Sequence, residues 1–361
     1  EYGEVDGKWT EKDTTTATAA NVVQADGLEI TGNARGTEIY GGRVEFKNTT
    51  IKTPGEIKIS AYSKDEGNTD FLSTTKKMTA GAENVVRLEN TKLLNVAPEA
   101  NDKLKSVEVL GGKVEIKDSE LTSDHTVDVM ALNSLDEMRL RAEAPYDSHY
   151  KTLKYEQHVD AANSIEITNS KLYANRASWD TYEKPDCYIN VLGGKVTLTD
   201  VDIKASRDVA IFAMRESKKD SGDVVSDTSN TVDLRGTKIE ADGAVGIWGG
   251  KAQLKDSSLK GGTLLVAAAG TLKGFMKDDA DYEFCPVADA DNTLYLEGTT
   301  LKSEMNAMDY TGKMSLMGGQ VASKGVGINA ASVEIYAGQM ESKDGKFYLT
   351  KGTPLHMDST K

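Results

Sequence analysis

The chain has 361 residues, a formal net charge of −14 and only 6% aromatic residues. A surface this acidic disfavours binding to nucleic acids, because phosphate groups are neutralised by a basic face. Two cysteines cannot form a disulfide framework, and no apolar run approaches the roughly 18 residues that a membrane-spanning helix needs. We therefore expect neither a nucleic-acid partner nor membrane insertion by this segment.

The N-terminal segment 1–25 is polar and rich in threonine, with Trp9 as its large apolar residue. It is predicted to be an entry strand or a loose cap. Leu28 and Ile30 then begin a first, irregular coil, and residues 26–361 are predicted to form a single solenoid. The chain begins without Met and ends inside the repeat, so we expect a processed or shortened segment.

A short strand pattern recurs along this solenoid, most clearly in the stretch 232–270. Each copy has apolar residues at its first and third positions and polar residues between them, the period of a strand with one buried face. A fixed repeat of about twenty residues is typical of a solenoid. The copies begin at Val44, Val86, Val114, Ile165, Val196, Val232, Ala252, Leu294, Met314 and Val333.

The fifth position of each copy carries a residue suited to a left-handed turn. Asn, Asp and Gly share a low energetic cost at positive φ, so the backbone is predicted to bend in the same way at each level. The last copy, with Ala337, departs from this rule. The other turn residues are Asn48, Asn90, Asp118, Asn169, Asp200, Gly236, Asp256, Gly298 and Gly318.

Two further strands are predicted in each coil. A short second strand contains an apolar residue such as Ile51 or Leu93, and a third strand begins six residues later in five coils. Stacked in parallel, three strands per coil bury one continuous apolar column, and 10 to 11 coils give a rod on the order of 50 Å long. The predicted third strands begin at Ile57, Val127, Val209, Val245 and Leu265.

Long insertions follow the third strand of alternate coils, near 62–83, 132–162, 215–229 and 270–291. Each returns through an Asn, whereas the intervening coils close with Gly-Gly. Two shorter insertions, near 95–105 and 174–186, enter before the third strand, so the loops are predicted to crowd one edge of the rod. Within 132–162, Ser134 and Glu137 form a capping box and Pro145 ends the pattern, which predicts a short helix.

The coil from Gly111 to Leu121, GGKVEIKDSEL, with its repeated Asn or Asp turn, resembles the right-handed parallel β-helix. An acidic, cysteine-poor rod rich in Gly and Thr looks most like the secreted passenger domain of Gram-negative autotransporter adhesins. The resemblance covers Leu28 to about Leu349. It implies display at the cell surface and adhesion, either to a host surface protein or glycan or to another copy of the chain, as in aggregation and biofilm formation.

The same architecture also carries polysaccharide lyases and phage tailspikes. The alternative function is therefore that of a β-helical polysaccharide lyase or glycoside hydrolase. Such an enzyme needs carboxylates, or a carboxylate with Arg or Lys, converging in one cleft. The nearest candidates are Asp128, Arg207, Asp208 and Arg215.

The outward positions of the first predicted sheet carry opposite charges side by side, as at Glu45, Lys47, Arg87 and Glu89. This pattern favours a solvated, self-neutralising ladder over a catalytic cluster. An acidic loop around 278–291 lacks the spacing of a calcium-binding loop, and the four histidines show no ligand spacing. We therefore predict no catalytic residue, metal or cofactor.

The third predicted sheet carries an apolar stripe along its outer face. A stripe of this size needs a partner or a cover. Three interpretations remain open: burial beneath the long insertions, an exposed stripe that binds a partner, or a register error that turns these residues inward. The residues predicted to contact a partner are Tyr40, Leu110, Met130, Leu192, Phe212 and Trp248.

Overall fold

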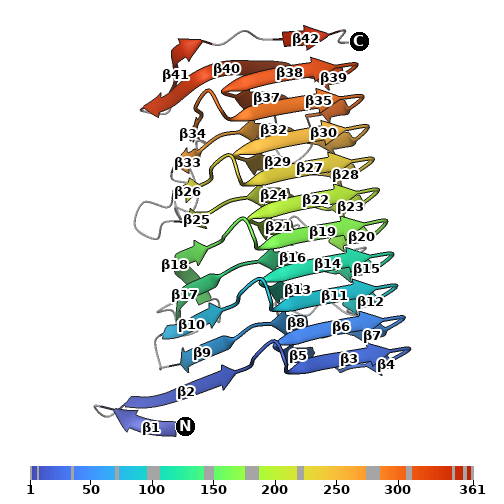
Figure 1. The fold of residues 1–361 in the computed structure, drawn as a ribbon, viewed down its shortest axis with the longest axis vertical. Helices are drawn as coiled ribbons and strands as arrows, with labels where there is room; N and C mark the ends of the chain where they lie inside the picture. Colours follow the sequence, from blue (N-terminus) through green and yellow to red (C-terminus); the bar gives the residue numbers. More distant parts are fainter. Residues whose placement is uncertain are drawn as a thin grey trace.

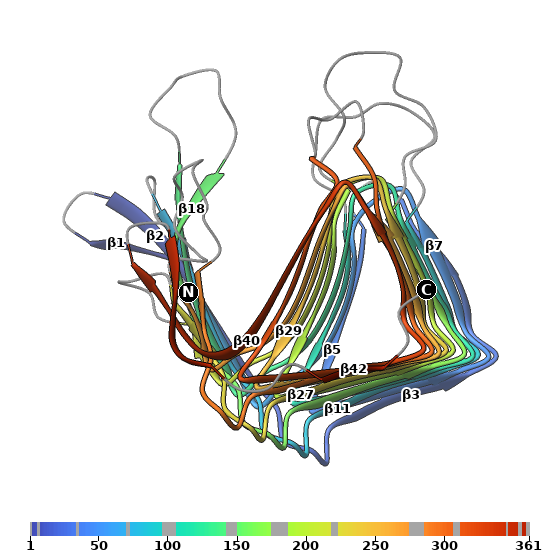
Figure 2. The same ribbon diagram turned by 90° about the horizontal axis from the view of Figure 1, so that it is seen from above.

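The computed structural model describes residues 2–5, 8–33, 36–69, 73–95, 106–141, 150–174, 187–217, 223–273, 285–305, 311–343, 346–352 and 356–358. These residues form a right-handed parallel β-helix, with no α-helix in any of these ranges. Three parallel sheets enclose a triangular column, and an antiparallel outer sheet stands beside it (Figures 1 and 2). The predicted fold class is confirmed.

The first sheet carries the strand pattern found in the sequence. Its strands pair in parallel and in register, so that Val44 lies beside Val86 and Val86 beside Val114. Inward positions therefore stack on inward positions along the whole rod. In order, the strands are β3 (Val22–Asp26), β6 (Arg43–Lys47), β11 (Val85–Glu89), β14 (Lys113–Lys117), β19 (Ser164–Thr168), β22 (Lys195–Thr199), β27 (Thr231–Arg235), β30 (Lys251–Lys255), β35 (Thr293–Glu297), β38 (Gln320–Lys324) and β42 (His356–Asp358).

The connection from the first sheet to the second contains one left-handed residue, as at Asn48 between β6 and the second-sheet strand that follows it. Eight of the ten predicted turn positions, from Asn48 to Gly298, have φ between 45° and 58°. The second sheet consists of β4 (Glu29–Thr31), β7 (Thr50–Thr53), β12 (Lys92–Asn95), β15 (Glu120–Ser123), β20 (Lys171–Ala174), β23 (Asp202–Ala205), β28 (Lys238–Ala241), β31 (Ser258–Gly261), β36 (Thr300–Ser303) and β39 (Gly327–Ala330).

The prediction of the last two first-sheet strands, which begin at Met314 and Val333, is wrong. Met314 and Val333 belong to the third sheet, where they are register partners. The first-sheet strand at this level is β38, and its turn residue is Gly325, with φ 61°. Neither Gly318 nor Ala337 is a left-handed turn residue.

The third sheet closes each coil. Its predicted start at Leu265 is wrong by one residue, because Leu264 is the register partner of the inward Val245 and Leu265 points outward with Gly246. The strands are β5 (Thr37–Gly41), β8 (Ile57–Ala61), β13 (Ser106–Gly111), β16 (Thr126–Ala131), β21 (Ile189–Gly193), β24 (Val209–Ala213), β29 (Ala244–Gly249), β32 (Thr263–Ala268), β37 (Lys313–Gly318) and β40 (Ser332–Lys343), with β41 (Lys346–Gly352) antiparallel to β40.

The long insertions form the outer sheet together with β1 and β2 of the N-terminal segment. Each insertion contributes a pair of antiparallel strands that join the next pair, and the predicted helix after Ser134 is instead strand β17, paired with its neighbours on both sides. Pairing in the sheet overrides the local capping signal. The strands are β1 (Tyr2–Val5), β2 (Lys8–Thr16), β9 (Lys64–Thr69), β10 (Ser73–Thr79), β17 (Ser134–Arg141), β18 (Tyr150–His158), β25 (Glu216–Ser217), β26 (Val224–Val225), β33 (Thr271–Lys273) and β34 (Cys285–Val287).

The alternation of insertions follows from strand spacing. Neighbouring strands lie about 4.8 Å apart in both the parallel and the antiparallel sheets. A pair of insertion strands therefore spans the height of two coils. One insertion for every two coils fills the outer sheet without a gap or a clash.

The corner where an insertion returns to the column is built in the same way at each level. The Asn163 side chain accepts a hydrogen bond from the Asp160 N–H and donates one to the carbonyl oxygen of Gly112, each at 2.8 Å. A Cβ atom on Gly194, in the next coil, would overlap the Asp160 carbonyl oxygen. The returning Asn and the Gly-Gly pair are thus two parts of one stacked corner. Asn84, Asn230 and Asn292 repeat it.

Candidate functional site

The outer face of the third sheet is the surface that the insertions surround. The long insertions leave from the edge where β8, β16, β24 and β32 end. The shorter ones lie between the second and third sheets, for example between β12 and β13. The outer face thus lies between the outer sheet and the corner that bears the shorter insertions (Figure 2).

The apolar stripe lies on this face and forms a second core with the outer sheet. Stripe residues pack with residues of the insertions, including Met78, Leu135, Val224 and Leu272. Phe212 and Trp248 meet edge to face, with ring centroids 6.1 Å apart. The stripe is therefore the floor of an interlayer, and the outer sheet is its cover.

Four of the six predicted contact residues are buried in this interlayer. Leu110, Leu192, Phe212 and Trp248 expose between 0% and 7% of their surface. This is the burial beneath the insertions that the sequence left open. Their predicted contact with a partner stays a prediction.

The other two contact residues lie nearer the surface. Met130 is partly buried against the same cluster. Tyr40 is 40% exposed, donates a hydrogen bond to Glu38 and stacks at a tilt on Tyr62. Burial beside the Glu38 carboxylate raises the pKa of the Tyr40 hydroxyl. The exposed end of the stripe is thus its N-terminal end.

The interlayer contains polar atoms without a hydrogen-bond partner. The indole Nε1 of Trp248 and both side-chain amide atoms of Gln157 are buried and unpaired, as is the Ser60 hydroxyl. Unpaired buried polar groups cost free energy. The interlayer is therefore less stable than a contact made only of apolar groups would be.

Charged residues gather on the N-terminal half of the outer face of the third sheet. Lys58 and Glu108 form an ion pair at 2.8 Å, and the next strand places Asp128 beside Glu108. Asn190 donates a hydrogen bond to Asp128 at 2.7 Å. The glutamate Glu56 accepts one from Ser106, and the cluster carries more acid than base.

Burial, and to a smaller extent this excess of carboxylates, raises the pKa values of two acids in the cluster. Burial, with smaller contributions from Glu108 and Glu56, raises the pKa of Asp128 from 3.8 to about 7. Burial also raises the pKa of Glu56, and Glu108 adds to this effect. Asp128 can therefore hold or release a proton near neutral pH, which is a property of general acids and bases.

The other residues named for the enzymatic alternative hold the corners of the coil. Arg207 places its guanidinium 5.3 Å from the Tyr188 ring centroid. Asp208 accepts a hydrogen bond from the Ala244 N–H at 2.6 Å. Arg215 pairs with Glu216 at 3.5 Å, at the start of an insertion. These contacts give each of the three side chains a role in the coil.

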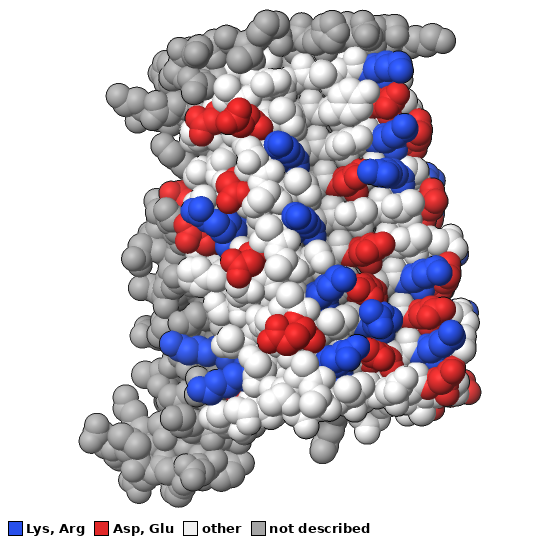
Figure 3. All heavy atoms as spheres, viewed as in Figure 1, with Lys and Arg blue, Asp and Glu red and all other residues white. Residues whose placement is uncertain are grey.

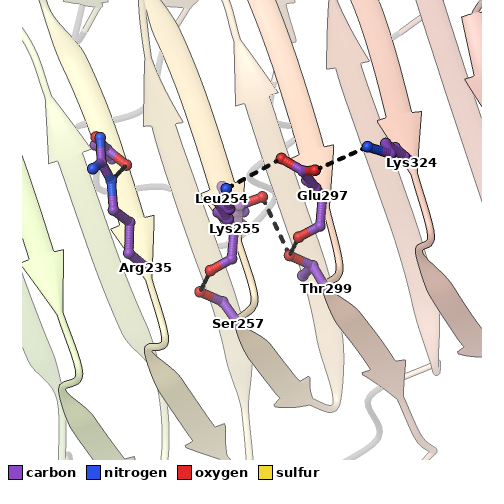
Figure 4. A network of polar contacts seen from close by, with 8 residues as sticks. Arg235, Leu254, Lys255, Ser257, Glu297, Thr299 and Lys324 are labelled. Carbon is purple, nitrogen blue, oxygen red and sulfur yellow. Dashed lines mark hydrogen bonds and ion pairs between the residues drawn. The ribbon is translucent and has the colours of Figure 1, made fainter.

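The outer faces of the first and second sheets carry ladders of paired charges. Glu297 lies between Lys255 at 3.6 Å and Lys324 at 3.4 Å, across three coils (Figure 4). Below this ladder, Ser257 and Thr299 donate hydrogen bonds to carbonyl oxygens at the corner. Figure 3 shows both signs of charge interspersed over this face. The ladder predicted from the sequence is present as ion pairs.

The described ranges contain no group of His, Cys, Asp and Glu side chains that could hold a metal ion. Residues 278–281 of the acidic loop lie outside the described residues. Cys187 is buried, and its thiol donates a hydrogen bond to the Asp124 carbonyl oxygen at 3.3 Å. In the part of the chain that the structure describes, no helix is long and apolar enough to cross a membrane.

Comparisons with protein-family models, with curated proteins and with solved structures found no match.

Proposed function

We propose that the chain is an adhesive rod of the autotransporter passenger type, displayed at the surface of a Gram-negative cell. It binds a host surface molecule or another copy of itself through the edges that bear insertions. The proposal is supported by the separate roles of the two cores, the apolar column and the interlayer beneath the outer sheet.

The apolar column is complete without the insertions. Among the residues that the structure describes, every buried member of the column comes from a coil strand or an adjacent corner, and none comes from 62–83, 132–162, 215–229 or 270–291. The insertions are therefore not needed to fill the column. They form the outer sheet and connect strands at the edges of the outer face of the third sheet. This is the arrangement expected of a rod that binds a partner.

The structure decides which substitutions can test this proposal. Replacing Trp248 or Phe212 by Ser would damage the interlayer, because both side chains are buried. Deleting 132–162 would remove β17 and β18 from the middle of the outer sheet. The segments 142–149 and 175–186 connect strands whose ends are described, so they can be replaced by short Gly-Ser linkers.

The test is adhesion to host-cell layers of cells that display the chain. Replacing 142–149 and 175–186 together should abolish adhesion and leave the melting temperature within a few degrees of the wild type. The matched control is Lys92→Ala with Lys171→Ala, at exposed positions of the second sheet, which should adhere normally. Unchanged adhesion after both replacements would contradict the proposal.

A polysaccharide-processing enzyme is the second candidate, and one observation favours it. Glu108 and Asp128 are register partners on neighbouring strands, about 5 Å apart at the backbone. One is ion-paired and the other has a pKa near 7. Two carboxyl groups about 5 Å apart serve retaining glycosidases as nucleophile and acid, and register partners on one face of a parallel sheet can bring their carboxyl groups to that separation.

Incubation with a panel of acidic and neutral glycans tests this second candidate. New reducing ends or unsaturated products, lost in Asp128→Asn, would support it. No product from any glycan, at enzyme concentrations that would reveal slow turnover, would count against it.

A further inference from the structure

A stripe of basic residues runs along the first sheet beside the insertion-bearing edge. In alternate coils the residue after the Gly-Gly pair is basic and begins a first-sheet strand. Because it recurs every second coil, neighbouring members lie about 10 Å apart along the rod. The base stripe consists of Arg43, Lys113, Lys195 and Lys251.

A stripe of acidic residues runs beside it. The coils between the basic ones are those in which an insertion returns through its Asn corner, and this corner carries at least one carboxylate from the third coil onward. Four of these side chains are exposed and Asp227 is partly buried. The acid stripe consists of Glu83, Asp160, Asp227, Asp289 and Asp291.

The two stripes do not neutralise each other within the chain. Arg43 and Lys113 pair with carboxylates on their own strands, Glu45 and Glu115. None of the ion pairs among the described residues joins a member of one stripe to a member of the other. Figure 3 shows the cations and carboxylates of this edge alternating in height along the rod.

We propose that this edge is the docking surface for a second copy of the chain, lying alongside the first with both rods parallel. A rotation of 180° about an axis parallel to the rod brings the base stripe of each copy opposite the acid stripe of the other. A 180° rotation about an axis perpendicular to the rod, from stripe to stripe, would oppose like charges. The surface is thus complementary to itself in one orientation.

A second copy fits this edge better than a polyanion or a polycation does. Either polymer would be attracted by one stripe and repelled by the other. Acids and bases occupy alternate coils, so a shift of one coil, about 5 Å, brings every facing pair level. The period of two coils is the same in both copies, and the match therefore continues along the whole length.

The strength of this pairing comes from the number of ion pairs that form at once. An exposed ion pair contributes roughly 0–1 kcal/mol, so a single pair of rods associates weakly. Beads that carry many copies in random orientation multiply the contacts and raise the avidity by orders of magnitude. This inference rests on the proposed adhesive function and names its partner and surface.

The experiment uses beads coated with the whole chain and measures clustering by light scattering. One variant reverses the base stripe through Lys113→Glu, Lys195→Glu and Lys251→Glu. The other reverses the acid stripe through Glu83→Lys, Asp289→Lys and Asp291→Lys. Asp160 and Asp227 are left unchanged, because their side chains bond Asn133 and Ser229.

Wild-type beads should cluster in low salt and disperse in 1 M salt, where charges are screened within about 3 Å. Beads carrying either variant alone should cluster at least tenfold more slowly, and a mixture of the two should cluster like the wild type. The matched control reverses Lys92, Lys171 and Lys238 to Glu on the second sheet, with the same change in net charge, and should cluster like the wild type.

Rescue by mixing establishes the docking surface. Clustering of either variant alone at the wild-type rate, or failure of the mixture when both variants melt like the wild type, would overturn it. If wild-type beads do not cluster but displayed cells still adhere to host layers, this inference fails and the proposed adhesive function stands.

Discussion

The column enclosed by the three parallel sheets and the interlayer beneath the outer sheet are two cores of different quality. The column is filled by Val, Ile and Leu in strict register, as at Val109, Val129 and Val191, all with no exposed surface. The interlayer mixes Ala, Met and aromatic residues and contains the unpaired polar atoms of Gln157 and Trp248.

This difference indicates that the column is the stable frame of the rod and that the outer layer is the part that can vary. Stacked coils share one geometry, so each coil stabilises the next. The outer sheet is held by one face and by its own strand pairing, and we expect it to open at a lower free energy than the column. A rod with a stable column can carry many different insertions on the same frame.

The largest expected effect comes from adjacent residues that belong to the two cores. Ile211 points into the column and Phe212 into the interlayer. Ile211→Ala should lower the free energy of unfolding by about 4 kcal/mol, because it leaves a cavity that the coils cannot close. Phe212→Ala should instead increase hydrogen exchange in β18 and β25, with the second sheet unaffected. If Phe212→Ala reduced protection from hydrogen exchange equally in the outer sheet and in the second sheet, the distinction between the two cores would be contradicted.

The corner that joins the two cores gives the next effect. A Cβ atom on Gly194 would overlap a backbone oxygen that cannot move without breaking the Asn163 corner. Gly194→Ala should therefore destabilise the protein by about 3 kcal/mol in urea denaturation. Gly327→Ala is the matched control, because its nearest neighbour atom lies 3.9 Å from the added Cβ. A similar loss in both variants would show that the stacked corner is not the cause.

The pH dependence of stability tests the carboxylates on the outer face. The folded-state pKa of Asp128, about 7, lies above its ordinary value of 3.8. The wild type should therefore lose stability as the pH rises from about 4 to about 7, because the folded state must release a proton that it binds more tightly than the unfolded state does. Asp128→Asn should be more stable than the wild type at pH 8, by an amount that the pKa difference limits to about 4 kcal/mol, and equally stable at pH 4. A gain that is the same at both pH values would contradict the assignment.

The smallest effect concerns the buried amide in the interlayer. Gln157→Met removes two unpaired polar atoms and leaves the backbone N–H free to donate to the Ser217 hydroxyl as before. It should raise the melting temperature, by an amount equivalent to about 1 kcal/mol. Gln253→Met, at a partly exposed first-sheet position, should leave it unchanged. A destabilised Gln157→Met would mean that the amide has a structural partner.

Local patterns predicted the column well and the outer sheet poorly. Eight of the turn residues are left-handed because Asn, Asp and Gly accept positive φ at low cost. The sequence pattern places Met314 in the wrong sheet because its strand, MSLMG, alternates like a first-sheet strand. Some strands of each kind are followed by glycine, so alternation alone cannot separate them.

The outer sheet could not be predicted because its pairing is remote in sequence. The strand after Ser134 pairs with residues about sixty positions earlier, and this ladder outweighs a local capping box. The sequence does not show that Leu265 points outward, because TLLVAA is apolar at every position after the threonine, which hides the alternation. The alternation of charge between neighbouring corners was visible in the sequence, but only the stacked coils show that it forms two stripes.

Hydrogen exchange of the wild-type chain tests the central claim that a stable column carries a separately stabilised outer layer. The amides of β14, β19 and β22 should exchange last and together, and those of β17, β18 and β25 should exchange at least tenfold faster through local opening. A single common rate for both groups would show that column and outer sheet open as one unit and would contradict this account.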